Sequence, residues 1–416
     1  MNLKNFLKTL GPGLLWAGAA IGVSHLVQST RAGAMYGFEL WYVVILINLF
    51  KYPFFEFAPR YAIATGENLL QGYQRLGKWA IYLFLGLTLG TMFPLVAAVV
   101  TVTAGIFSQV FPSVFNDTFQ WTLLILFLTA VFVGIGRYST IDKLMKFIII
   151  LLTISTVAAV VAVFFGEELQ SFQEKSFKWE FADIAFLIAF AGWMPTAIDV
   201  AVWHSMWTLA KKEEIGYTPT LKEALLDFNI GYIGTIVSAL CFVLLGAYVM
   251  YNSGEVLSDS STVFSGQVIS MFTKSLGTWA YPLIAIAALT TMTSTVITVI
   301  DAFPRVLKYS TEIVAPPLKK IKPKVANIIW IVILLSGSIV ILKFFSKEGF
   351  KVLVDFATTI SFLTAPLLGY MNYKVITAKN VPLEAQPKLW LKILSWLGLI
   401  VLSGFSVYYI LWKFFF

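Results

Sequence analysis

The chain has 416 residues, of which 58% are hydrophobic and 16% aromatic, and only 12% carry a charge. Soluble proteins average about 25% charged residues, so this composition excludes a soluble protein and indicates an integral membrane protein. The net charge of +8 does not indicate nucleic-acid binding, because most lysines and arginines fall in short connections between apolar stretches. The single cysteine, Cys241, excludes an intrachain disulfide.

Apolar stretches of about 20 residues, each long enough to cross a bilayer, recur along the chain. We expect an all-α membrane protein that forms a single transport domain over residues 1–416. About eleven transmembrane helices are predicted at residues 11–36, 39–63, 78–110, 119–136, 144–165, 183–209, 228–251, 277–304, 326–343, 352–375 and 390–412. The connections at 166–182 and 252–276 are the longest on their side, and irregular structure is expected at residues 258–261 and 316–317.

Lysines and arginines are more frequent in the connections on the side that holds the N-terminus. Cytoplasmic connections carry such an excess, so this bias predicts a cytoplasmic N-terminus. With eleven segments, the C-terminus is then outside. We expect a bacterial-type plasma membrane, contacts with membrane lipids and no nucleic-acid partner. Lys4 and Lys8 precede the first apolar run without a small-residue cleavage site, so the first segment is expected to stay in the protein.

The first apolar segment is built to break in its middle. Gly22, Val23, Ser24 and His25 interrupt two apolar halves with a glycine, a hydroxyl and an imidazole. An ionisable ring at membrane depth indicates a functional site. Glycine allows the backbone to leave helical geometry, and free backbone groups at this depth are tolerated only where they are buried or line a cavity. We therefore expect a discontinuous helix with a binding site at the break.

The sixth segment, 183–210, is also interrupted, at residues 191–196, where Pro195 removes a backbone donor. Two broken segments, five segments apart, are typical of inverted-repeat transporters with a site at the midplane. We expect repeats at about 11–165 and 183–375, with an added helix at about 390–412. The only histidines are His25 and His204, and no catalytic or metalloprotease motif is present. We expect a transporter that is not an enzyme and has no cofactor.

Several stretches carry recognisable motifs: GPGLL at 11–15, AGAMYGF at 32–38, the stretch 58–69, Gly136-Arg137 with the following 142–144, and Met194-Pro195. Together these motifs resemble those of the Nramp family of divalent-metal transporters. The resemblance covers roughly the first ten segments. It implies a LeuT-like inverted-repeat fold and a secondary transporter that moves a divalent metal by symport.

The chain departs from the family at the residues that would bind metal. The family carries Asp-Pro-Gly-Asn at the first break, where this chain has Gly22 to His25. Alignment therefore puts Gly22 in place of the metal-binding carboxylate and His25 in place of the asparagine. The methionine ligand is kept as Met194, the family's histidine after Met-Pro falls on Thr196, and its tenth-segment glutamine falls near Thr358. The acidic residues of the family's third segment have no match in 91–107. These departures indicate a divergent member with a rebuilt or abandoned metal site.

The remaining residues permit a non-standard metal site. Imidazole and thioether groups suit transition metals, so His25, Met194 and Asp199 form the predicted ligand set. Asp199 and Lys51 are both intramembrane charges, each costing roughly 2.5–3.5 kcal/mol on insertion scales, so we expect them to balance each other. Lys51 then takes the place of a coupling cation and disfavours a cationic substrate. Glu56, a second candidate for charge balance, is four residues before Arg60 and is expected to pair with it.

Two substrate classes stay open at this point. The resemblance, with His25 and Met194, places a divalent metal cation first. A small organic solute resembling an amino-acid zwitterion is the alternative, because helix starts at a break attract carboxylates and tryptophans can cover such a ligand. The predicted substrate contacts are Gly22, Val23, Ser24, His25, Trp193, Met194, Thr196, Asp199 and Thr358. Protons or sodium are the expected coupling ions, with the hydroxyl-rich stretch 290–295 as one place for sodium. A sensor that transports nothing is a further alternative.

Overall fold

A computed structural model describes residues 9–115, 117–135, 153–163, 180–251, 253 and 255–415. Within these residues the chain is helical and has no strand, as predicted. Eight of the described helical stretches are long and apolar enough to cross a membrane: Trp41–Thr65 (α4), Lys78–Val110 (α6), Thr118–Ile135 (α7), Leu221–Tyr251 (α11 with the π-helical turn η2), Thr278–Val314 (mainly α13), Pro323–Phe344 (α14), Phe350–Ile376 (α15) and Leu389–Phe415 (α16).

The first predicted segment is broken as expected. Helix α2 (Pro12–Ala20) ends where Ile21 adopts an extended conformation, and the chain resumes as the π-helical turn η1 (Ser24–Ser29) followed by α3 (Thr30–Tyr36). The start of α2 is fixed by Asp227 of α11, whose carboxylate accepts hydrogen bonds from the N–H groups of Gly11 at 3.0 Å and Gly13 at 2.6 Å. These bonds satisfy donors that a helix start leaves without partners.

The sixth predicted segment is broken in the same way. Helix α9 (Phe181–Gly192) ends before a non-helical stretch, 193–199, and α10 (Val200–Ile215) follows. The Met194-Pro195 peptide within this stretch is cis. Pro195 cannot donate a backbone hydrogen bond, which is the physical reason why the sequence indicated a break here.

Two helices were not predicted. Helix α12 (Ser261–Leu276) lies in the stretch expected to be an irregular connection and packs against α6 and α13. Its serines and threonines lower its average hydropathy, but Phe264, Val268 and Phe272, each four residues apart, are buried on one face. The short helix α5 (Leu69–Leu76) begins at Asn68, whose side chain accepts a hydrogen bond from the N–H of Gln71. A cap of this kind is a local signal that hydropathy alone does not detect.

Helix α13 (Tyr281–Val314) extends ten residues beyond its predicted end. The added turns begin with Arg305, which pairs at 2.7 Å with Asp301 of the predicted segment and stabilises a charged helix end that the hydropathy pattern had excluded. Of the predicted segment 144–165, only the helix Thr153–Val163 lies within the described residues. The predicted motif residues 136–137 and 142–144 lie outside them, so the count of eleven segments stays a prediction.

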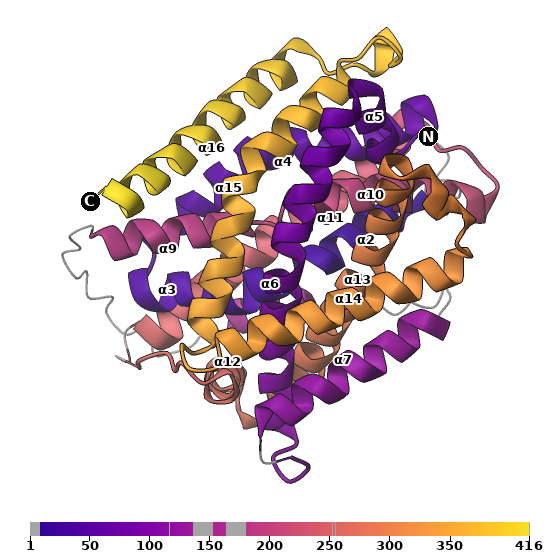
Figure 1. Ribbon diagram of the computed structural model, residues 1–416. Coiled ribbons are helices and arrows are strands. Elements are labelled where there is room, and N and C mark those ends of the chain that lie inside the picture. The colour runs from indigo at the N-terminus through magenta and orange to yellow at the C-terminus, as the bar shows by residue number, and fades with distance from the viewer. Residues whose placement is uncertain are drawn as a thin grey trace.

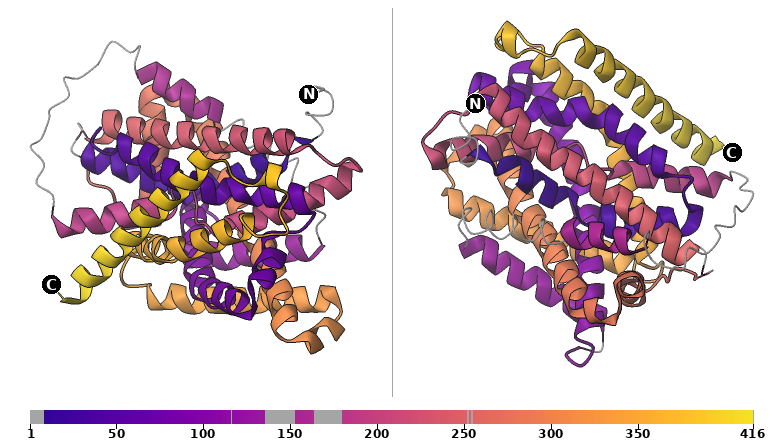
Figure 2. Two further views of the ribbon diagram at one scale, coloured as in Figure 1. Left: turned by 90° about the horizontal axis from the view of Figure 1, so that it is seen from above. Right: turned by 180° about the vertical axis from the view of Figure 1, so that it is seen from behind.

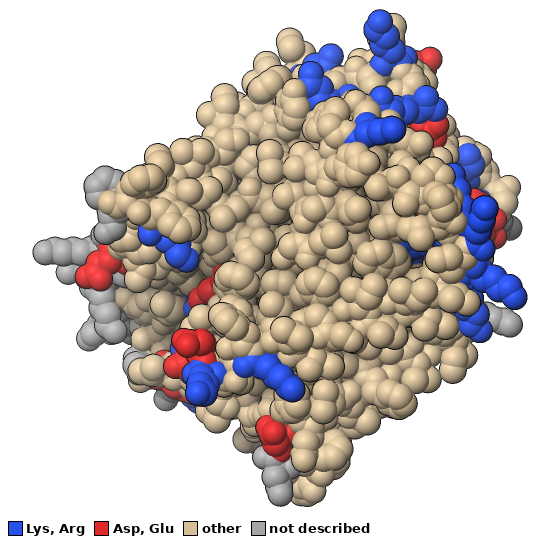
Figure 3. Space-filling view, in the orientation of Figure 1, with Lys and Arg blue, Asp and Glu red and all other residues tan. Residues whose placement is uncertain are grey.

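The two broken helices lie inside the bundle, and unbroken helices surround them (Figure 1). Helix α2 contacts α11, α10 and α13, whereas α16 packs on the outside against α4, α15 and α9 (Figures 1 and 2). Figure 3 shows lysines and arginines over the end of the bundle around α5, and a mixed group of charges near α12, with a broad uncharged belt between them. We call the α5 side the basic end and the α12 side the far end. The belt fits the apolar zone of a bilayer.

Candidate functional site

A cavity of about 30 Å³ lies where the two broken helices meet. The first break contributes Val23 and Ser24, and the second contributes Trp193 and Thr196. The second break also contributes Ala197, and the remaining wall comes from α2, α6, α10 and α13, through Ala19, Ala20, Leu95, Val99, Val200, Trp203, Thr295 and Val299. The cavity therefore sits at the place that the sequence predicted for a binding site, between two stretches of non-helical backbone.

His25 is fully buried at the first break and turns toward α11. Its Nε2 lies 3.0 Å from the carbonyl oxygen of Thr235, and its Nδ1 lies 2.7 Å from Ser24 Oγ. A carbonyl oxygen can only accept, so Nε2 carries a proton and donates it. Ser24 Oγ also lies 2.6 Å from the carbonyl oxygen of Ala20, the last residue of α2. Both ring nitrogens thus have partners, and neither ring nitrogen is free to bind a metal ion in this conformation.

Lys51 of α4 is fully buried and reaches the second break. Its Nζ donates hydrogen bonds to the carbonyl oxygens of Ala191 at 2.6 Å, Gly192 at 2.8 Å and Thr196 at 3.4 Å. An ammonium group has three protons, and here each has an acceptor. The first two acceptors are the last carbonyls of α9, which a helix end leaves without intrahelical partners.

Asp199 precedes α10 and lies three residues after Thr196, whose carbonyl oxygen accepts from Lys51. It is 5% exposed, and its Oδ1 has no hydrogen-bond partner. Both residues belong to the described part of the chain, and no direct ion pair joins them. That Lys51 and Asp199 balance each other's charge therefore stays a prediction, and carbonyl oxygens are the direct partners of Lys51.

Other predicted contacts lie around both breaks. Trp193 Nε1 donates to Ser361 Oγ of α15 at 2.8 Å, and the fully buried Met194 follows it. Thr358 packs directly on Gly192, where a Cβ atom would come within 1.9 Å of the Thr358 carbonyl oxygen. Gly22 is similarly close to α13, since a Cβ there would meet Thr295 Oγ1 at 2.8 Å. Small residues at the breaks thus allow close packing around the cavity.

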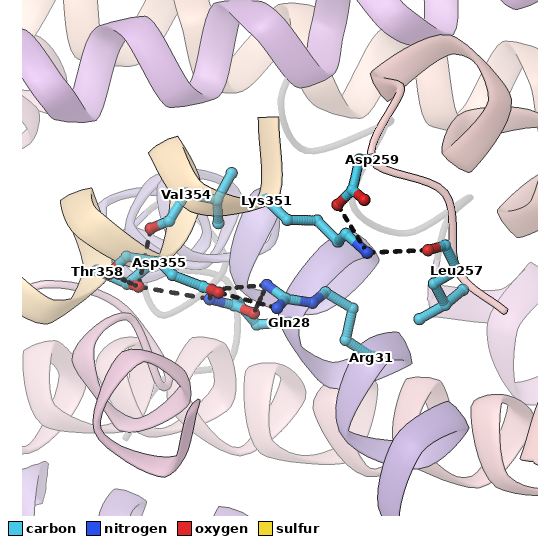
Figure 4. Close-up of polar contacts among 8 residues, drawn as sticks. All are labelled: Gln28, Arg31, Leu257, Asp259, Lys351, Val354, Asp355 and Thr358. Atoms are coloured by element: carbon cyan, nitrogen blue, oxygen red, sulfur yellow. Dashed lines mark hydrogen bonds and ion pairs between the residues drawn. The ribbon is translucent and has the colours of Figure 1, made fainter. Parts of the chain in front are cut away.

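A polar network ties the second half of the first broken helix to α15 (Figure 4). Arg31 donates to both carboxylate oxygens of Asp355, at 2.6 and 2.9 Å, and to Gln28 Oε1 at 2.9 Å. Gln28 in turn donates to Asp355 at 2.9 Å and to Thr358 Oγ1 at 3.4 Å. Nearby, Lys351 pairs with Asp259 at 2.9 Å. The network links α3 and α15 between the cavity and the far end.

On its other side the cavity is bounded by Trp203. This residue also lines a second cavity of about 260 Å³ toward the basic end, with Asn68, Glu213 and Arg305 among the other wall residues. The indole packs edge-on against Phe303 at 5.0 Å, and its Nε1 is buried without a partner. Trp203 is therefore a shared wall between the central cavity and the larger cavity.

The structure brings some of the predicted residues together and separates others. Val23, Ser24, Trp193 and Thr196 line one cavity. The predicted pairing of Glu56 with Arg60 is confirmed by an ion pair between them. Within the described ranges, no three His, Cys, Asp or Glu side chains gather as a metal site. The set His25, Met194 and Asp199 stays a prediction.

Sequence reasoning missed the network of Gln28, Arg31 and Asp355. Asp355 was not among the predicted site residues. The available signal was an arginine three residues after a glutamine inside the second half of a broken apolar segment, a spacing that puts both on one helix face. The partner helix could not be identified from spacing alone.

Comparisons with known proteins identify the family of the sequence and proteins of similar fold. The sequence matches the family described as natural resistance-associated macrophage protein-like, Nramp, over residues 13–412. The chain is 35% identical over 407 residues to an uncharacterized protein, PM0681, of Pasteurella multocida, covering 96% of this chain and 91% of that protein. The manganese transporter of Eremococcus coleocola is similar in structure, with a TM-score of 0.70 at 13% identity, over 98% of this chain and 86% of that one. MhsT, solved with L-phenylalanine, has a TM-score of 0.67 at 14% identity, over 96% and 97%.

Proposed function

This chain belongs to the Nramp family, and we propose that it moves a small organic solute without net charge, such as a small zwitterion, by alternating access. It is a membrane protein with the LeuT fold and a transporter of the secondary type. One observation carries the choice of substrate: among the described residues that line the central cavity, none has a charged side chain. Hydroxyl groups and indole rings supply its polar contacts.

A divalent metal cation fits this cavity less well than an organic solute. Divalent cations are held by carboxylates, imidazoles or thiolates. Both nitrogens of His25 are already hydrogen-bonded, and the ammonium of Lys51 repels a cation near the second break. The manganese transporter of Eremococcus coleocola shares the fold at 13% identity, and a likeness in fold at this identity does not identify the substrate. Of the two substrate classes that the sequence left open, we therefore favour the organic solute.

The cavity also limits the size of the solute. A volume of about 30 Å³ holds roughly two or three water molecules, since one water needs about 10–15 Å³ measured in this way. This room suits a zwitterion of the size of glycine or alanine in the closed conformation. Helix α10 begins at Val200 on the cavity wall.

The placement in the membrane is part of the same proposal. The basic end faces the cytoplasm together with the N-terminus, and the C-terminus lies outside, in a bacterial-type plasma membrane. The transport domain consists of two repeats, at about 11–165 and 183–375, with an added helix at about 390–412. Alternating access then opens the cavity first past the network at Arg31 and later past Trp203.

Ligand binding to purified protein tests the proposed cargo. Glycine, alanine and other small zwitterions are added in increasing concentration, and the melting temperature is followed. We expect a saturable rise for at least one of them, because a ligand that binds only the folded state stabilises it. Thr196→Glu places a carboxylate in the cavity and should abolish the rise, whereas Lys274→Ala, at an exposed pair with Glu255, should keep it. If manganese stabilises the wild type and no zwitterion does, the proposal is wrong.

A further inference from the structure

We propose that the ammonium of Lys51 is the built-in cation of this transporter, fixed covalently at the position where a freely exchanging cation would otherwise bind. This inference deepens the proposed function. Only the predicted effect of Lys51 on solute uptake depends on the proposed solute transport. It assigns to Lys51 a role in ion specificity: the second break needs a positive charge, and the chain supplies it.

The end of α9 provides the ligands of a cation site. The carbonyl groups at a helix C-terminus lack intrahelical partners and carry the negative end of the helix dipole. In transporters with broken helices, such carbonyls and half-helix ends coordinate the coupling ion. Here Ala191 and Gly192 present their carbonyl oxygens at the end of α9, and Thr196 adds a third from the break. Lys51 Nζ is within hydrogen-bonding distance of all three.

The electrostatic environment also favours one positive charge. Asp199 is buried three residues after Thr196, which supplies one of these carbonyls. A buried carboxylate without a compensating cation is costly. Three carbonyl oxygens and a nearby carboxylate make up an oxygen-rich environment that a hard monovalent cation prefers. Because the ammonium is already bound there, no position remains for a free ion.

The first break is closed in a parallel way. The carbonyl of Ala20, at the end of α2, lies 2.6 Å from Ser24 Oγ, which also contacts the imidazole of His25 at 2.7 Å. A side chain thus binds backbone carbonyl oxygen at each half-helix end. The consequence is that solute uptake should not require sodium, since the ammonium of Lys51 already occupies the carbonyl group at the second break.

Removal of the ammonium tests this assignment directly. Lys51→Ala leaves the carbonyl oxygens and Asp199 in place with a channel where the side chain was. The probes are sodium ion and n-propylammonium, which replaces the atoms that the substitution deletes. We expect either cation to raise the melting temperature of the purified Lys51→Ala protein saturably, by about 2 °C or more, and to leave the wild type unchanged.

Two controls separate this role from a general need for cations. The double variant Lys51→Ala, Asp199→Asn lacks the carboxylate and should lose the cation response. Lys211→Ala removes another buried lysine, one that pairs with Glu214 at 2.9 Å, and should show no response. A folded Lys51→Ala protein that ignores both cations overturns the proposal, and so does a wild type that responds equally.

A second variant keeps the proposal falsifiable if Lys51→Ala does not fold. Lys51→Met fills the same space without charge or donors, so the proposal expects at least a tenfold loss of solute uptake. Uptake at the wild-type rate by Lys51→Met would overturn it. Because the melting experiment needs no solute, a failure to find any transported zwitterion would count against the proposed cargo and leave the test of Lys51 intact.

Discussion

Replacing Asp355 by Asn should weaken the network that closes the cavity toward the far end. In the structure, Arg31 holds Asp355 through two hydrogen bonds, at 2.6 and 2.9 Å. The arginine side chain is 7% exposed and that of the aspartate 34% exposed, so water competes from one side only. Asparagine keeps the size of the side chain, but it removes the charge and one of the two acceptors.

The size of the effect follows from the energy of this contact. A hydrogen bond to a charged group contributes about 1.5–3 kcal/mol net, and the partial exposure of Asp355 favours the lower half of that range. Each 1.4 kcal/mol changes an equilibrium tenfold. If the network holds this side closed, its loss should raise the population open toward the far end roughly tenfold or more. Any rate that requires this opening should rise by the same factor.

Thiol labelling measures that opening. The single native cysteine, Cys241, is replaced by Ser, and Thr196→Cys places a thiol in the cavity wall. A membrane-impermeant thiol reagent is added on the far-end side, and the labelling rate is compared with and without Asp355→Asn. Lys274→Ala serves as the control, because its exposed pair with Glu255 should contribute little. An unchanged rate in Asp355→Asn, or an equal rise in the control, would refute the reasoning.

Two other substitutions probe the packing around the cavity. Gly192→Ala places a Cβ atom 1.9 Å from the Thr358 carbonyl oxygen, so it should destabilise the fold by about 1–3 kcal/mol or more. Thermal melting in detergent measures this loss of stability. Gly234→Ala is the control, because a Cβ atom there faces open space, and it should be nearly neutral. Trp203→Ala removes the wall between the central cavity and the one of about 260 Å³, so labelling of Thr196→Cys from the basic end should become faster. Labelling at the wild-type rate in a folded Trp203→Ala protein would show that the indole is not the barrier.

The sequence predicted the parts of the fold that depend on local backbone chemistry. Gly22 marked the first break because glycine tolerates non-helical backbone, and Pro195 marked the second because it cannot donate a backbone hydrogen bond. Helix α12 was missed because its burial comes from packing against α6 and α13, and its mixed composition does not reveal those neighbours.

The candidate site was predicted in outline and not in its contacts. Spacing along one helix correctly paired Glu56 with Arg60. Spacing could not show that Lys51 binds carbonyl oxygens of α9, because those acceptors are backbone groups that exist in every sequence. The contact between Arg31 and Asp355 joins residues 324 positions apart, so only the folded arrangement of α3 and α15 identifies it.

The most direct test of the account is flux through wild-type protein in sealed proteoliposomes. Uptake of small radiolabelled zwitterions and of manganese is measured side by side, in sodium-containing and sodium-free buffer. The account predicts saturable uptake of a zwitterion that does not need sodium, with no manganese flux above that of empty vesicles. Saturable manganese uptake, with no flux of any zwitterion, would contradict it and restore the metal cation as the cargo.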